Sequence, residues 1–189
     1  TINSFTDSYS NWIKAHDDDN GKTMTGAAVL LTGDVTLDQL NAVNDDTSGA
    51  ITFTSVRDTR ENIASIHGNA AYDMSSATVK VSDQVNLAQA DTLDTYTTGS
   101  LVVESFTGTS GNFLEAHDTD NTKDMTTAAV VITNQINLTV ADQIDDDTSG
   151  AVTINSFTDS YSNWIKAHDT DNGKTMGGAA VLLTGDVTL

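Results

Sequence analysis

Three short acidic loops are the first places in this sequence where residue types and spacing suit a chemical function. Each loop follows a histidine and gathers aspartates and an asparagine within a few residues, as in His117-Asp-Thr-Asp-Asn121. Closely spaced carboxylates and amide carbonyls are the ligands that calcium requires. The sequence therefore predicts one calcium ion in each loop, and the predicted ligands are Asp17, Asp19, Asn20, Asp118, Asp120, Asn121, Asp169, Asp171 and Asn172.

A hydrated turn without a metal is the alternative interpretation of these loops. The residue spacing of an EF-hand loop and its terminal glutamate are missing here. The equivalent loop after His67 has no carboxylate, and Asn20-Gly21 is also an ordinary turn sequence. Calcium is the one cofactor that the sequence suggests.

A second group of acids occupies Asn44–Thr47 and Asp145–Thr148. Acids at the C-terminal end of a helix oppose its dipole, so they favour either a bound cation or an exposed, hydrated loop. The stretch Asp147-Thr-Ser-Gly150 differs from the Asp-Thr-Gly of aspartic proteases by an inserted serine. Because the sequence also lacks a catalytic-triad order, a glycine-rich phosphate loop and a zinc pattern, we expect no enzymatic activity.

An internal repeat of about 51 residues organises the whole chain. Residues 1–37 and 153–189 match at 35 of 37 positions, and two more divergent copies lie between them. The histidines keep this register, with spacings of 51, 50 and 51 residues, and the methionines keep it as well. We therefore expect a single array over residues 1–189, made of the units 1–50, 51–100, 101–151 and a partial unit 152–189.

Three repeated columns have structural interpretations. A periodic histidine is either a metal ligand or a pH sensor in some proteins, but copies about two turns apart are too distant to share one ion. We expect each histidine to be a half-buried residue that closes a helix, and the methionines and large apolar residues to form ladders in the core. The columns are His16, His67, His117 and His168; Met24, Met74, Met125 and Met176; and Trp12, Ile63, Phe113 and Trp164.

Each unit contains two strand–helix pairs. Short apolar, β-branched runs such as Ala27–Leu31 and Ala50–Phe53 are typical of buried parallel strands. Apolar residues at helical spacing predict a first helix over residues 9–16, and the capping-box pattern Thr36-Leu-Asp-Gln39 predicts the start of a second. We expect the glycine after each second helix to adopt a positive φ and end that helix. These glycines are Gly49, Gly99 and Gly150.

This alternation predicts an α/β fold. We expect a right-handed solenoid with one parallel strand and one short helix per ~25-residue turn. An all-β solenoid is the alternative, because the helical segments contain many asparagines, aspartates and threonines. A β-sandwich fits less well, because the apolar runs do not alternate with polar residues.

The charge excludes several classes of function. The chain has 27 acidic and 8 basic side chains, a net charge of -19, and no cysteine. Nucleic acid and anionic membranes would be repelled, and disulfides or thiolate metal sites are ruled out. The sequence contains no apolar run near the roughly 20 residues of a membrane span, so we expect no membrane insertion.

The two terminal segments are the most alike in the array, although a complete solenoid usually ends in atypical capping repeats. We therefore expect either a window within a longer array or a subunit that assembles end to end with identical subunits. Both expectations imply a long fibre.

The stretches Val140–Ile144, Thr148–Val152, Gln89–Leu93 and Thr97–Gly99 resemble repeats of very large secreted surface proteins. Such proteins are known from cyanobacteria and other aquatic bacteria, are often exported by type I secretion, and sometimes carry calcium-binding modules. The Gly-Gly-x-Gly-x-Asp calcium signature is missing from this chain. The resemblance implies a structural role at the cell surface or outside the cell.

The expected function is that of a non-enzymatic structural repeat protein in an extracellular filament, sheath, surface layer or giant surface stalk. The alternative is an adhesin or a calcium-dependent binding module. Expected partners are identical subunits or neighbouring repeats, and cell-surface polysaccharide. An ice-binding surface is disfavoured, because Thr52-Phe-Thr54 and Thr107-Gly-Thr109 lie at different registers of the repeat.

Overall fold

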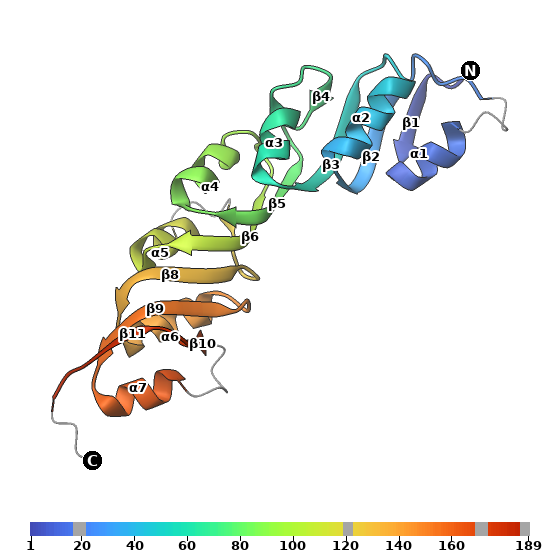
Figure 1. Ribbon diagram of the computed structural model, residues 1–189. Helices are drawn as coiled ribbons and strands as arrows, with labels where there is room; N and C mark the ends of the chain where they lie inside the picture. The colour runs from blue at the N-terminus through green and yellow to red at the C-terminus, as the bar shows by residue number, and fades with distance from the viewer. Residues whose placement is uncertain (17–21, 119–122, 169–173, 186–189) are drawn as a thin grey trace. The chain divides into compact units, whose positions relative to one another are not determined.

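The computed structural model describes residues 1–16, 22–118, 123–168 and 174–185. Strands and helices follow one another along the chain (Figure 1). After three of the described helices, a two-residue strand precedes the next longer strand. The chain forms two compact units, one of Thr1–Asp83 with Thr92–Val102 and the other of Gln84–Asp91 with Val103–Leu189. Each unit is described by itself.

The first unit is a parallel ladder in the order β1-β2-β3-β5. The short strand β4 pairs with the beginning of β3, and β5 pairs with its end. Its elements are β1 (Ser4–Asp7), α1 (Tyr9–His16), β2 (Ala28–Val35), α2 (Leu37–Asp46), β3 (Ile51–Asp58), α3 (Arg60–His67), β4 (Tyr72–Asp73) and β5 (Thr78–Val85). Helix α4 (Leu87–Asp94) begins in the second unit and ends in the first.

The second unit repeats this plan, with the parallel order β6-β8-β9. Strands β10 and β11 both pair with β9, and β7 pairs with β6. The elements are β6 (Leu101–Gly108), α5 (Ser110–Asp118), β7 (Lys123–Asp124), β8 (Ala129–Ile136), α6 (Leu138–Asp147), β9 (Val152–Asp159), α7 (Tyr161–His168), β10 (Lys174–Thr175) and β11 (Ala180–Leu183).

The expected α/β class with parallel strands is confirmed. The described residues contain seven helices, so the all-β alternative is wrong. Side-chain caps offset the weak helix propensity of these segments. Thr36 and Gln39 form the expected capping box, Asn86 and Gln89 form a second one, and Asn137 accepts a hydrogen bond from the N–H of Val140 at 3.0 Å.

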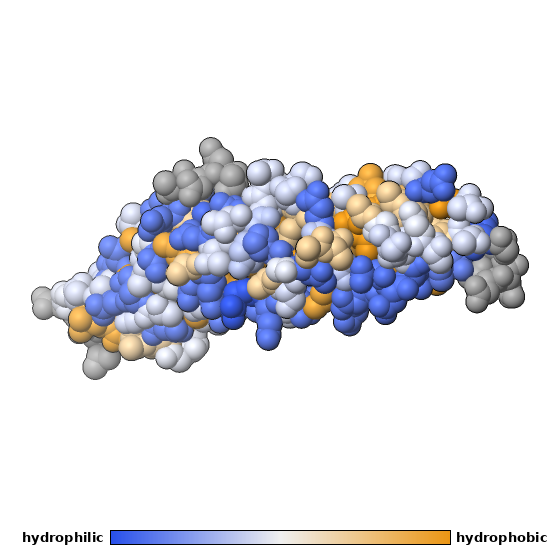
Figure 2. All heavy atoms as spheres, turned by 90° about the horizontal axis from the view of Figure 1, so that it is seen from above, coloured by the Kyte–Doolittle hydropathy of each residue, from blue (hydrophilic) through white to orange (hydrophobic). Residues whose placement is uncertain are grey.

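The core lies on one face of the strands, where the helices pack. In β3, Ile51, Phe53 and Val56 are buried, whereas Thr52 and Thr54 on the opposite face are half-buried and exposed. The sequence pattern predicted buried strands, and the structure restricts that burial to the face under the helices. On the surface shown in Figure 2, hydrophilic residues are widespread and hydrophobic ones form separate patches.

The methionine ladder is confirmed, because Met24, Met74, Met125 and Met176 are 5% exposed or less. Trp12, Ile63 and Phe113 are fully buried in the equivalent place, whereas Trp164 is half-buried. Each fully buried side chain of this size stabilises the fold by roughly 1.5–3 kcal/mol relative to an exposed one.

The positive-φ expectation for the glycines after the second helices is wrong. Among the described residues, positive φ occurs at Gly33, Gly178 and Gly185. Gly49 is needed for a different reason, because a Cβ there would lie 2.0 Å from the carbonyl oxygen of Ala27. The same approach recurs at Gly99 on Ala77 and at Gly150 on Ala128, at 2.4 and 2.1 Å.

None of the described helices combines the length and the apolar character needed to cross a membrane.

Candidate functional site

The predicted calcium ligands fall almost entirely outside the described residues. Asp118 is the last residue of α5, and its side chain is not among those described. Calcium binding therefore stays a prediction. Within the described residues, no three histidine or acidic side chains are grouped so that they would hold a metal ion. The predicted ligands outside the described residues are Asp17, Asp19, Asn20, Asp120, Asn121, Asp169, Asp171 and Asn172.

The second acidic cluster connects consecutive helices. Asp46 at the end of α2 accepts a hydrogen bond from the indole N–H of Trp12 at 3.2 Å and lies 3.5 Å from Nδ1 of His16. Asp147 at the end of α6 lies 3.9 Å from Nδ1 of His117. These carboxylates are only 26% and 21% exposed. An exposed, hydrated loop was one of the two expectations for these acids, and it is wrong at Asp46 and Asp147, although Asp45 is exposed.

The second repeat replaces this polar contact with a stacked pair. Tyr96 occupies the position of Asp46 and Asp147, and its ring stacks on His67 with centroids 4.0 Å apart and planes 13° apart. His16 and His117 are half-buried, as expected, whereas His67 and His168 are exposed. The expected half-buried role thus holds in two copies of four.

A buried lysine pairs with two carboxylates in the second unit. Lys174 opens β10 and is 9% exposed, and its ammonium lies 3.0 Å from Asp142 and 3.2 Å from Asp145, both on α6. Burial by itself would lower the pKa of Lys174, but the hydrogen bonds to the two carboxylates outweigh it and the pKa is raised. Lys123 opens β7 in the same way and lies 3.2 Å from Asp91 of α4.

The equivalent contact in the first unit carries no charge. Tyr72 opens β4, and its hydroxyl donates a hydrogen bond of 2.6 Å to the side-chain oxygen of Asn41 on α2. Burial raises the pKa of Tyr72, and the nearby carboxylate of Asp45 adds to this effect. The phenol therefore stays protonated and remains a donor at neutral pH.

Aligning the repeats shows that both sides of this contact change together. Where the short strand opens with tyrosine, the preceding second helix carries Asn41 and Asn44; where it opens with lysine, that helix carries two aspartates. Our sequence reasoning missed these residues, although the signal was present in the repeat columns. The equivalent positions on the short strands are Tyr72, Lys123 and Lys174, and Lys22 shares their register but lies in no described strand. On the helices the equivalent pairs are Asn41 with Asn44, Asp91 with Asp94, and Asp142 with Asp145.

The starts of the second helices α2 and α6 also donate hydrogen bonds to a carboxylate at the end of the following strand. Asp159 accepts hydrogen bonds from its own helix through Oδ1 and from the N–H of Leu138 on α6 through Oδ2, at 3.2 Å. The hydrogen bond from Asn163, followed by those from the N–H groups of Ser160 and Leu138, lowers the pKa of Asp159. Asp58 makes the same bridge to Leu37 at 2.9 Å in the first unit. These carboxylates satisfy donors that helix starts otherwise leave free.

Hydroxyl groups complete the repeated contacts. Thr47 and Thr148 donate to the carbonyls of Ala27 and Ala128, each at 2.8 Å. Thr97 makes the same bond to the carbonyl of Ala77 at 2.6 Å. In the protease-like stretch Asp147–Gly150, the hydroxyl of Thr148 is therefore engaged by the backbone carbonyl of Ala128.

No protein-family model, curated protein or solved structure matches this chain.

Proposed function

We propose that this chain is a non-enzymatic structural array, built as a right-handed solenoid with one strand and one short helix per ~25-residue turn. The observation that carries the proposal is that the same contacts between consecutive pairs recur in both units. The threonine bond to an alanine carbonyl, the glycine approach and the short-strand contact return at the repeat period. Repetition of contacts between neighbours is what allows an array to grow in length.

The polar side chains in these contacts form hydrogen bonds with backbone groups and with neighbouring side chains. Asp58 and Asp159 bind helix starts, and Thr47 binds a strand carbonyl. The pocket beside Lys174, of about 410 Å³, is open and lined mainly by charged side chains. Such a surface suits a hydrated exterior better than a buried small-molecule site.

An extracellular filament, sheath, surface layer or giant surface stalk is the setting we propose. The net charge of -19 and the lack of cysteine suit a hydrated surface that does not depend on redox conditions. The resemblance to repeats of very large secreted surface proteins supports the same setting. Neighbouring repeats of the same kind are the proposed partners.

Small-angle X-ray scattering of the full chain tests the solenoid. A compact globular chain of this length would have a radius of gyration of about 16 Å. We expect a clearly larger value and a cross-section that stays constant along the particle. A value of about 16 Å would contradict the solenoid. Immunogold labelling of intact source cells tests the extracellular setting, and labelling confined to the cell interior would contradict it.

A further inference from the structure

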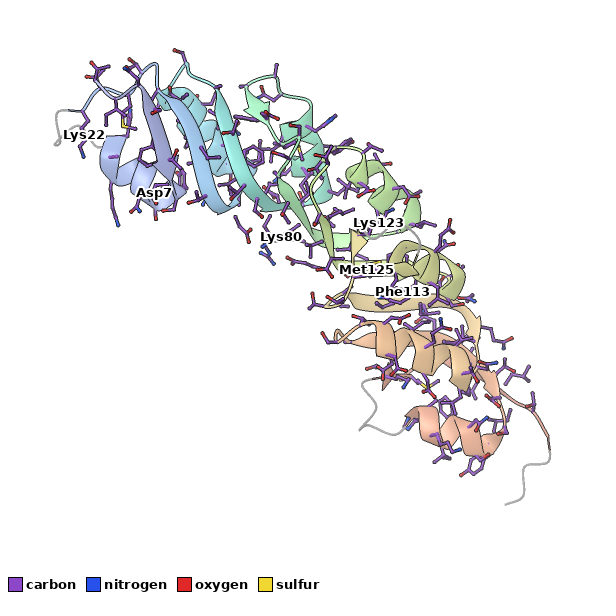
Figure 3. All side chains as sticks on the ribbon, turned by 180° about the vertical axis from the view of Figure 1, so that it is seen from behind. Asp7, Lys22, Lys80, Phe113, Lys123 and Met125 are labelled. Atoms are coloured by element: carbon purple, nitrogen blue, oxygen red, sulfur yellow. The ribbon has the colours of Figure 1, made fainter. Side chains whose placement is uncertain are left out.

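Lys22 differs from its equivalents in its surroundings. Lys123 and Lys174 are buried against aspartates of a preceding second helix, whereas Lys22 is exposed (Figure 3). At this position of the repeat, the lysine is therefore buried and paired in two copies and exposed in one.

Two further features near the start of the chain also differ from their equivalents in the second unit. Strand β1 pairs with β2 along one edge, and no strand of the described residues pairs with its other edge, whereas the equivalent β9 pairs on both sides. Asp7, also labelled in Figure 3, makes its hydrogen bonds within its own helix start, to Ser8 and Asn11. Its equivalent Asp159 additionally binds Leu138 of the preceding helix.

A nearly identical copy of the first 24 residues lies later in the chain, where its contacts with a preceding repeat are seen. Residues 1–24 and 153–176 differ at one position, Asp18 against Thr170. In the second unit, the described residues of this copy, 153–168 and 174–176, contact β8 and α6 through strand pairing, the Asp159–Leu138 bond and the Lys174 contact. The same side chains in residues 1–24 have the chemistry to bind the same kind of partner.

We propose that β1, Asp7 and Lys22 form a docking face for a further repeat whose second helix carries two aspartates, as α4 and α6 do. This inference rests on the proposed repeat array and names the repeat that fits beside the first one. A helix of the α2 type, with Asn41 and Asn44, is rejected. On α2 the equivalent positions carry the neutral amides of Asn41 and Asn44, and the nearby carboxylate of Asp45 is exposed. A lysine buried there would lose hydration without the two paired carboxylates that Asp142 and Asp145 supply.

An extended chain tests the docking face. A second copy of residues 102–152 is placed before Thr1, so that Val152 of the added copy precedes Thr1 as it precedes Thr153 in the native chain. The rate of acetylation of each lysine is measured by mass spectrometry, with Lys174 as the buried reference. We expect acetylation of Lys22 to slow about tenfold, toward the rate of Lys174.

The matched control carries Asp142→Asn and Asp145→Asn in the added copy alone. Lys22 should then be acetylated several times faster than in the extended chain with the native aspartates. Equal Lys22 rates in the native and extended chains, with the added repeat folded by circular dichroism, would overturn the proposal. Equal rates with the aspartate and asparagine versions would do the same.

A second measurement uses the original chain and does not depend on the extension. Tyr72→Lys should lower the Tm, because it buries an ammonium beside Asn41 and Asn44. Adding Asn41→Asp and Asn44→Asp should recover most of the loss. If the triple variant melts no higher than Tyr72→Lys alone, the pairing rule is wrong.

The scattering experiment separates this inference from the proposed function. An elongated chain in which Lys22 stays reactive after extension overturns the docking face alone. A compact chain in which Lys22 becomes protected overturns the solenoid and supports the docking face.

Discussion

The α2–β4 contact of the first unit and the α6–β10 contact of the second unit occupy equivalent places in the repeat. The first is a neutral hydrogen bond between Tyr72 and Asn41 at 2.6 Å. The second is an ion pair of Lys174 with Asp142 and Asp145 at 3.0 and 3.2 Å. The comparison teaches that this backbone arrangement accepts either chemistry, and in both contacts the two partners match each other.

Both units share a close approach of a glycine to a backbone carbonyl. We expect this approach to matter equally in the two units, whichever pair of side chains forms the short-strand contact. Gly49→Ala and Gly150→Ala each force a Cβ to within 2.0 and 2.1 Å of a backbone carbonyl oxygen. We expect each variant to lose more than about 3 kcal/mol in the free energy of unfolding, more than any other substitution at these contacts. Urea titration measures it.

Gly26→Ala is the matched control for this prediction, because nothing lies within 4 Å of the added Cβ. It should change stability far less than either variant. A Gly150→Ala protein as stable as the Gly26→Ala protein would show that the close approach is not required.

Lys174→Met should break the charged contact. The substitution keeps the apolar stem and leaves Asp142 and Asp145 facing each other without a cation. Because Asp142 is 51% exposed, the loss should fall below that of a fully buried ion pair, at about 2 kcal/mol. Thermal and urea unfolding measure it, and Lys22→Met is the exposed control. Equal stability of the two variants would contradict the assigned role of Lys174.

Tyr72→Phe should have a smaller effect at the neutral contact. It removes one hydroxyl and leaves Asn41, an exposed residue, able to bind water. We expect a loss of about 1 kcal/mol in the free energy of unfolding, measured by urea titration. A loss larger than that of Lys174→Met would reverse our ranking of the two contacts.

The smallest expected effect is the pH dependence at alkaline pH. The pKa values of Lys174 and Tyr72 are both raised in the folded chain. Each shift therefore contributes its full stabilisation of the folded chain below about pH 10, and this contribution falls as the pH rises further. At alkaline pH the free energy of unfolding should fall, and Lys174→Met should remove one part of this fall and Tyr72→Phe the other part. Urea titrations from about pH 8 to pH 11.5 compare the slopes. If the free energy of unfolding depends on pH in both variants as it does in the native chain, these pKa shifts are wrong.

Local patterns in the sequence predicted the elements well. The Thr36–Gln39 capping box depends on contacts within four residues, and it forms as expected. Apolar residues at helical spacing correctly placed α1, and the methionine column correctly marked the core. These features are local or repeat with the period, so a single sequence carries them.

Contacts between residues far apart in the chain were not predicted. Gly49 was assigned to a positive φ, whereas its role depends on Ala27, 22 positions earlier. The pairing of Tyr72 with Asn41 and of Lys174 with Asp142 was missed, because these partners lie on different elements. An exposed, hydrated loop was one of the two expectations for Asp46 and Asp147. The helix that covers each aspartate lies about 30 residues earlier in the chain, so the residues around the aspartate do not reveal it.

The sequence by itself determined the period, the alternation of strands and helices, the caps and the acidic character of this protein. These properties follow from the identity and spacing of residues along the chain. The tertiary structure alone decided which face of the strands is buried, why a glycine must follow each second helix, and which lysines are paired. Those outcomes depend on the approach of one strand–helix pair to the next, which brings together groups that spacing along the chain leaves apart.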